Sequence, residues 1–174
     1  YRWRDKVNIL ILHVLMETLL QQPRWLVHPL TVEEHLGFSM KLVRDVPIRE
    51  LKGHETINPI YLDTLRKQIE ADGVLKRPIA VDQATHVVLD GHHRLEALKK
   101  LGYSKIPVYY VDYGSPLIEV HPWREGEKVS KEMVIQAGLT GHTLPPKTTR
   151  HMVRLSQRLV HISHIQKIIN VPLE

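Results

Sequence analysis

The sequence contains no cysteine. This absence excludes a disulfide framework, a thiolate metal site, a cysteine nucleophile and thiol redox chemistry. A long apolar run is also missing, because the most apolar segment, residues 7–20, is interrupted by polar residues and is too short to cross a hydrocarbon core as a helix. We therefore expect a cytoplasmic protein that does not span a membrane.

Basic residues only slightly outnumber acidic residues. The chain has 174 residues, of which 43% are hydrophobic and 25% charged, as is usual for a soluble globular domain with one core. The net charge of +5 favours anionic ligands. The basic residues are spread along the chain rather than gathered in one run, so nucleic-acid binding is not expected from the charge alone.

Helical patterns dominate the first 41 residues, which we interpret as an N-terminal helical extension. Residues 7–20 predict an amphipathic helix that packs on this domain or on a partner, and a homo-oligomer could form through it. Residues 42–113 predict a mixed α+β core. Residues 114–174 predict an irregular C-terminal segment that contains one helix, over residues 130–137, and completes the substrate site.

The core has clear helix and strand signals. Asn58 is a predicted helix cap, Pro59 occupies the first helical position, and Gly73 ends that helix. A second helix follows Gly91 and is closed by Gly102. Strands are predicted over residues 42–51, 79–81, 87–89 and 105–112, with a loop over 73–78. The predicted order is strand, helix, strand, strand, helix, strand.

The most informative stretch is the direct passage from a strand into a helix at Asp90, Gly91, His92, His93 and Arg94. The first N–H groups of a helix have no partner within the helix, and the helix dipole adds positive charge there, so phosphate is a natural occupant. Glycine allows close approach of the backbone, and the two histidines and the arginine offer donors and charge. The alternative is an ordinary Asp-Gly turn with exposed histidines.

These residues resemble the ParB/sulfiredoxin-like fold, a small mixed sheet with a phosphate-binding loop and helix. Within it, the Asp90 to Arg94 motif, His54-Glu55 and residues 146–151, Pro-Lys-Thr-Thr-Arg-His, resemble the free serine kinases. These are cytoplasmic enzymes of archaea and some bacteria that phosphorylate free L-serine, typically with ADP. The reaction of sulfiredoxin itself is excluded, since it needs a cysteine.

The resemblance implies a nucleotide-binding and a catalytic part of the site. The nucleotide, ADP or ATP, would be held by Gly91, His92, His93 and Arg94, the last with a forked set of donors for phosphate. Glu55 would act as general base toward the serine hydroxyl. Asp90 would hold Mg²⁺, a cation that usually takes one or two carboxylates and the phosphates as ligands; alternatively it orients the histidines by hydrogen bonding.

Recognition of the serine is implied for residues 147–151, and for Trp123, which in His121-Pro-Trp resembles the tryptophan of a Thr-Trp-Tyr-Pro segment in these kinases. These are suited to a carboxylate through hydroxyl, ammonium and guanidinium donors, with a tryptophan as a wall. They are Trp123, Lys147, Thr148, Thr149, Arg150 and His151. Only about two dozen residues separate Trp123 from Lys147, fewer than in free serine kinases, so the acceptor stays open between serine and another small hydroxy compound.

Other functions remain as alternatives. A ParB-like nucleotide- or DNA-binding module shares the fold, and residues 130–139 could begin a helix-turn-helix. Pro145 and Pro146 fall where its recognition helix would run, which disfavours that motif. A nuclease is disfavoured because no cluster of metal-binding carboxylates surrounds the motif. An enzyme acting on another phosphorylated metabolite is the third alternative.

Overall fold

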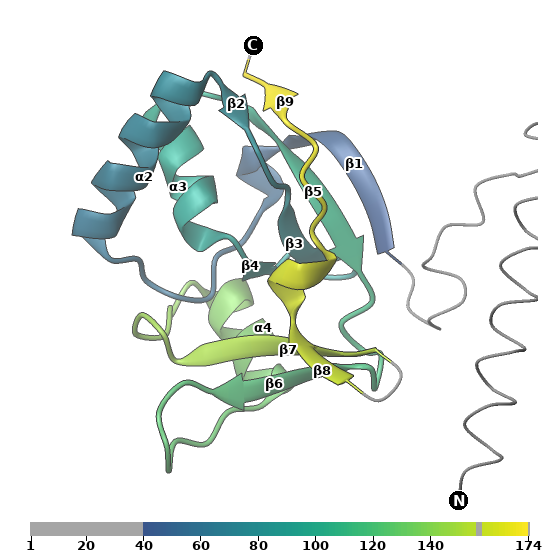
Figure 1. Cartoon of the computed structure of the whole chain (residues 1–174). Helices are drawn as coiled ribbons and strands as arrows, with labels where there is room; N and C mark the ends of the chain where they lie inside the picture. Colours follow the sequence, from purple (N-terminus) through teal and green to yellow (C-terminus); the bar gives the residue numbers. More distant parts are fainter. Residues whose placement is uncertain (1–39, 156–157, 174) are drawn as a thin grey trace, which may run out of the picture. The chain divides into compact units, whose positions relative to one another are not determined.

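The computed structural model describes residues 40–155 and 158–173, which belong to one structural unit of the chain (Figure 1). The predicted helix over residues 7–20, and nearly all of the predicted extension over residues 1–41, lie outside the described residues. Strand β1 begins at Met40, two residues before the start that the sequence predicts for the first strand.

A four-stranded mixed sheet forms the centre, in the order β1 (Met40–Pro47), β5 (Lys105–Val111), β3 (Ile79–Asp82) and β4 (Val88–Asp90). Strands β3 and β5 run parallel, and the other neighbours are antiparallel. The predicted α+β class and the order of elements in the core are confirmed. The first strand was predicted too long, because after Pro47 the chain turns into a short 3-10 helix, Ile48–Glu50.

Helices α2 (Pro59–Asp72) and α3 (His92–Lys100) pack on one face of this sheet (Figure 1). The Asn58 side chain accepts hydrogen bonds from the N–H groups of Ile60 and Tyr61, and Gly73 ends α2 in the left-handed conformation, both as predicted. Between helices and sheet lies an apolar core that includes Val46, Leu62, Ile69, Ile79, Val81, Val88, Leu95, Leu98, Ile106 and Val108. Burial of these alternating strand residues fixes which face carries the helices.

The opposite face is covered by α4 (Lys131–Thr140) and a second, antiparallel sheet of β6 (Ile118–Pro122), β7 (Thr149–Leu155) and β8 (Arg158–His161) (Figure 1). The prediction that this segment is irregular is therefore wrong. Strand β7 was missed because two of its buried positions are polar, Thr149 and His151, which hides the alternation of apolar and polar residues. The second core contains Ala80, Val87, Leu89, Val111, Tyr113, Ile118, Val134, Val153 and Ile162.

A short pairing joins the C-terminal part of the chain to the helical layer. Strand β2 (Val74–Leu75), in a segment predicted to be a loop, pairs with β9 (Val171–Pro172). The 3-10 helix Ile162–Ile165 precedes this pairing and leads to Gln166, which is buried beside α3. Within the described ranges, no helix is long and apolar enough to cross a membrane.

Candidate active site

A cleft of about 710 Å³ lies beside the start of α3. Most of its lining comes from three segments that are far apart in the sequence: the loop after β1, the β4–α3 junction, and the beginning of β7 with the turn before it. Eleven of the twelve residues predicted for the site line it, namely Glu55, Asp90, Gly91, His92, His93, Arg94, Trp123, Lys147, Thr149, Arg150 and His151. The fold thus brings together almost all of the residues that the sequence singled out.

The β4–α3 junction depends on the glycine at position 91. Gly91 has a φ of 103°, a conformation that other residues rarely adopt, and a Cβ atom there would lie 2.4 Å from Cγ2 of Ile79. The chain can therefore enter α3 directly from the sheet only with glycine at this point. The first N–H groups of α3, which lack partners within the helix, border the cleft.

Arg94 fixes this junction from inside. Its Nη1 donates to the carbonyl oxygens of Arg77 and Pro78, at 3.1 and 2.6 Å, and its Nη2 donates to Asp90 Oδ2 at 2.6 Å and to Gln166 Oε1 at 3.0 Å. Gln166 Nε2 also donates to Asp90 Oδ2, at 2.8 Å. Both terminal nitrogens of Arg94 are therefore used by the protein, and the predicted fork of donors toward phosphate is not what the structure presents.

His92 and His93 also differ from the prediction that they supply donors and charge. Nε2 of His92 accepts from the backbone N–H of His54 at 3.2 Å, and Nε2 of His93 accepts from that of Asn58 at 3.0 Å. Burial, with neighbouring His54 and His151, holds the pKa of His92 well below its ordinary value, and burial lowers that of His93. These two hydrogen bonds connect the loop after β1 to α3.

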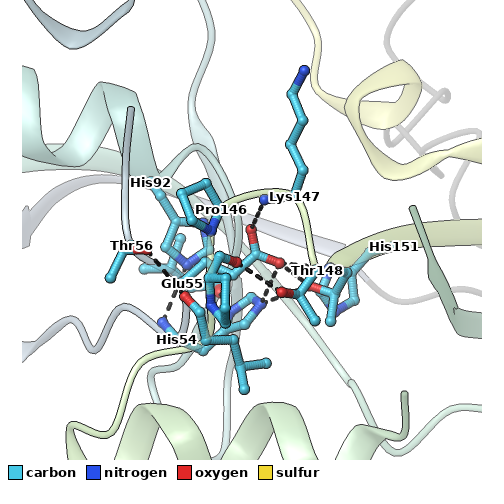
Figure 2. A network of polar contacts seen from close by, with 12 residues as sticks. His54, Glu55, Thr56, His92, Pro146, Lys147, Thr148 and His151 are labelled. Carbon is cyan, nitrogen blue, oxygen red and sulfur yellow. Dashed lines mark hydrogen bonds and ion pairs between the residues drawn. The ribbon is translucent and has the colours of Figure 1, made fainter. Parts of the chain in front are cut away.

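The carboxylate of Glu55 is held by the turn that leads into β7 (Figure 2). Its Oε2 accepts from the backbone N–H of Lys147 at 3.1 Å, and its Oε1 accepts from the N–H and the hydroxyl of Thr149 at 2.6 and 2.5 Å. Lys147 adopts a φ of 55°, and its side chain extends away from the carboxylate (Figure 2). These contacts fix the carboxylate at the edge of the cleft.

Two buried histidines lie beneath Glu55. Nδ1 of His54 lies 2.7 Å from the carbonyl oxygen of Val88, and burial of the ring lowers its pKa to about 4. His151 packs edge-on against His54, with ring centres 5.5 Å apart, and its Nε2 lies 3.0 Å from the hydroxyl of Tyr113. Burial holds the pKa of His151 well below its ordinary value, so both rings are neutral at neutral pH.

The residues predicted to bind a carboxylate fall into two groups. Thr148 is buried outside the cleft lining, and its hydroxyl donates to the carbonyl of Pro145 at 2.8 Å. Thr149 and His151 line the cleft but are buried and bonded to protein groups, so their role toward a substrate carboxylate stays a prediction. Lys147 and Arg150 are exposed at the cleft, and the guanidinium of Arg150 lies 5.7 Å from the ring centre of Trp123.

The cleft offers few ligands for a metal ion. Among the residues that the structure describes, no group of three or more histidines and carboxylates is placed to hold one. Asp90 borders the cleft, and its hydrogen bonds to Arg94 and Gln166 both end at Oδ2, so Oδ1 is the oxygen that could face a cation. One carboxylate oxygen suits Mg²⁺ that arrives with the phosphates of a nucleotide, and it does not suit a site made of protein ligands alone.

His54, Gln166 and Tyr113 hold side chains of the site by hydrogen bonds, and the sequence assigned no role to any of them. His54 is adjacent to Glu55, which was a usable signal, although its partners were not evident. Gln166 bonds to Arg94 and Asp90, which lie 72 and 76 positions away in the chain, and Tyr113 bonds to His151, 38 positions away. No local sequence pattern indicates such distant contacts.

Sequence comparison identifies relatives over the core. An ATP-dependent L-serine kinase from Staphylothermus marinus is 35% identical over 82 residues, which is 45% of this chain and 32% of that protein. The ATP-dependent L-serine kinase SbnI from Staphylococcus aureus is 39% identical over 77 residues, 42% of this chain and 29% of that protein. A ParB-like protein from Sulfolobus acidocaldarius is 38% identical over 80 residues, 43% of this chain and 37% of that protein. No family model matches the sequence.

The solved structure of a free serine kinase in complex with AMP has the same fold, with a TM-score of 0.59 at 15% sequence identity. The match covers 71% of this chain and 90% of that one. The chain resembles the L-serine kinases in sequence and in fold. The predicted resemblance is thereby confirmed, and the matched segments span about a third of the length of the curated relatives.

Proposed function

We propose that the chain is a small-molecule kinase that transfers a phosphoryl group from ADP or ATP to the hydroxyl of free L-serine, giving O-phospho-L-serine. The observation that carries this proposal is the cleft itself, in which a fixed carboxylate, a helix N-terminus and exposed cations meet. Phosphoryl transfer to a hydroxyl needs a proton acceptor, stabilisation of phosphate charge and positioning of both substrates. Similarity to named L-serine kinases supports the choice of acceptor.

The phosphates of the nucleotide would lie at the start of α3. The backbone N–H groups of residues 92–94 and the positive end of the helix dipole stabilise anionic oxygens there. The Asp90 carboxylate, oriented by Arg94 and Gln166, would hold Mg²⁺ through Oδ1 together with those phosphates. When bound, this ion neutralises charge on the transferring group.

Glu55 is the proposed general base. The turn at residues 147–149 holds its carboxylate rigidly, so the direction in which it accepts a proton is set before the substrate binds. As the serine oxygen forms a bond to phosphorus and the bond from phosphorus to the nucleotide breaks, the hydroxyl proton passes to Glu55. The nucleotide leaves with one phosphoryl group fewer.

Recognition of the amino acid falls to the exposed residues. Lys147 and Arg150 would bind the serine carboxylate, and Trp123, beside Arg150, would form a wall of the pocket. A cation that stacks on an aromatic ring loses freedom, which favours binding of a planar anion. The absence of cysteine agrees with the cytoplasm as the proposed location.

Phosphorus NMR tests the proposal directly. The whole chain is incubated with Mg²⁺, L-serine and either ADP or ATP, and the Glu55→Gln variant serves as the control of equal shape. We expect the O-phosphoserine signal with at least one donor and its loss in the variant, and the productive donor identifies the nucleotide. Absence of phosphoserine with both donors, while either nucleotide still raises the melting temperature, would rule out serine as acceptor and retain only nucleotide binding.

The second candidate is a ParB-like nucleotide- or DNA-binding module without kinase activity. The match to a ParB-like protein favours it. Against the DNA-binding form, α4 is followed by a loop and then by strand β7, so no recognition helix follows it at this point of the described chain. Titration of fluorescent duplex DNA at several salt concentrations would distinguish the two, since this candidate requires salt-dependent binding and no phosphoserine.

A further inference from the structure

One hydroxyl group joins Glu55 to the buried His54. The Oγ1 atom of Thr149 lies 2.5 Å from Oε1 of Glu55 and 2.9 Å from Nε2 of His54. A hydroxyl carries a single hydrogen, so it can donate to only one of these two atoms at a time. The other contact is a hydrogen bond only if the partner itself supplies a proton.

The tautomer and the charge of the His54 ring follow from its surroundings. The carbonyl oxygen of Val88 only accepts, so the Nδ1 atom that faces it at 2.7 Å must carry a hydrogen. Burial lowers the pKa of His54 to about 4, so the ring is neutral at neutral pH and Nε2 is an acceptor. The hydroxyl of Thr149 is the donor placed to fill this acceptor.

Two arrangements of the hydrogens are then possible. When Glu55 is ionised, Thr149 donates to the carboxylate, and the lone pair of His54 Nε2 faces an oxygen that offers it no hydrogen. When Glu55 carries a proton on Oε1, Glu55 donates to Thr149, and Thr149 donates to His54. With a neutral His54 ring, both short contacts are hydrogen bonds only in the second arrangement. A protonated His54, whose Nε2 lies 3.7 Å from Glu55 Oε1, would also donate to Thr149, and burial of the ring disfavours that charged state. The pair of distances therefore favours a place for one additional proton.

We propose that Thr149 and His54 form a hydroxyl switch that stabilises Glu55 in its protonated form and so makes it a better proton acceptor in the kinase reaction, on whose assignment this inference rests. When the serine O–H bond breaks, the proton is held on Glu55 and the hydrogen of Thr149 turns from Glu55 to His54. His54 gains no proton and touches no substrate. Thr149 and His54 are thus positioning residues.

Other titratable groups surround the switch on every side. His92 and His93 face it from α3, His151 faces His54 from β7, and Lys147 precedes Thr149. Burial holds the pKa values of His92 and His151 well below the ordinary value, and burial also lowers that of His93. With these rings neutral, the proposed proton transfer in this cluster takes place at Glu55 alone.

Two substitutions of His54 separate the switch from a purely structural role. His54→Asn keeps a group at the position of Nδ1, which contacts Val88, and removes the acceptor at Nε2; His54→Gln keeps an acceptor near Nε2 and loses the contact with Val88. We expect His54→Asn to move the acidic limb of the kcat profile to lower pH by up to about one unit, the equivalent of one hydrogen bond. His54→Gln should leave the limb in place. Equal shifts in both variants would overturn the switch.

Thr149 provides a second pair of variants in case those of His54 fail to fold. Thr149→Ser keeps the hydroxyl, so the acidic limb of the kcat profile should stay at the same pH. Thr149→Val keeps the shape and the backbone hydrogen bond to Glu55 but loses the hydroxyl, so the acidic limb should move. A limb that is the same in Thr149→Val as in the wild type would contradict the proposal.

Nitrogen-15 NMR of the His54 ring tests the switch without any kinase activity. In the wild type, the Nε2 resonance should shift as Glu55 gains a proton, and this step should vanish in Thr149→Val and in Glu55→Gln. A step that persists in both variants would overturn the switch even if phosphoserine is formed. If the step behaves as expected and the wild type forms no phosphoserine, the kinase assignment fails, and only the hydrogen-bonding part of the inference is retained.

Discussion

At the scale of single residues, the site divides into buried groups that fix geometry and exposed groups that are free to bind. Arg94, His92 and Thr149 resemble ligand-binding residues in the sequence. In the structure, however, Nη1 and Nη2 of Arg94, Nε2 of His92 and Oγ1 of Thr149 are bonded to the protein. Lys147 and Arg150 line the cleft, and both are exposed. Substrate binding is therefore expected to depend on the exposed pair.

Replacement of that pair tests this division. Lys147→Met and Arg150→Met should each raise KM for serine by about 10- to 100-fold, the value of one charge-assisted hydrogen bond, with a smaller effect on kcat. Steady-state kinetics with serine as the varied substrate provide the measurement. Arg154→Met is the matched control, since Arg154 lies on the same strand as Arg150 but pairs with Glu119 outside the cleft. An equal rise of KM in the control would show that charge on β7 acts nonspecifically.

At the scale of elements, the passage from β4 into α3 is the feature on which the site is built. It places a helix N-terminus directly at the end of a buried strand, and Gly91 makes this possible through its backbone conformation and its missing Cβ. The loop after β1 and the turn before β7 are then attached to this junction through His93 and Glu55. A change at Gly91 should therefore affect folding before it affects chemistry.

Gly91→Ala should lower the free energy of unfolding by about 3 kcal/mol, because the left-handed conformation and the contact with Ile79 both oppose a methyl group. Gly141→Ala is the control: Gly141 also has a positive φ, of 74°, but a Cβ there meets no atom within 4 Å. The control should lose only about 1 to 2 kcal/mol. Urea denaturation measures the free energy of unfolding of both variants. Equal losses would mean that the contact of a methyl group with Ile79 does not destabilise the protein.

At the scale of the whole molecule, neutral histidines are part of the interior. His54, His92 and His151 connect α3, the loop after β1 and β7, and all three have lowered pKa values because they are buried. In the unfolded chain these rings take up protons near pH 6.5. The unfolded state therefore binds more protons below that pH, and acid favours unfolding.

Stability should consequently be constant above about pH 7 and fall as the pH drops from about 6.5 toward 4. For His54 alone, whose pKa is lowered from 6.5 to about 4, the loss between pH 7.5 and pH 5 is about 2 kcal/mol. Urea denaturation at a series of pH values measures it, and His54→Asn should reduce the slope by about one proton. A free energy of unfolding that does not change between pH 7.5 and pH 5 would contradict the lowered pKa values.

Local sequence signals were sufficient to predict the helices of the core and to single out residues that line the cleft. Asn58, Pro59 and Gly73 fixed α2, because capping and chain termination depend on neighbouring residues only. The run from Asp90 to Arg94, with Glu55 and the basic segment near residue 150, indicated the cleft through residue types and their spacing alone. These signals are short in range and independent of packing.

Tertiary contacts, in contrast, determine which of those residues are free to act. The hydrogen-bond partners of Glu55 lie 92 to 94 positions away in the chain, and those of His54 lie 34 to 95 positions away. Apart from the nearby Asp90, the partners of Arg94 lie 16 to 72 positions away. A hydrogen bond formed by such a contact consumes a donor that a motif alone would assign to a ligand. The second sheet was hidden for the same reason, because the polar residues of β7 are buried by partners that only the folded chain supplies.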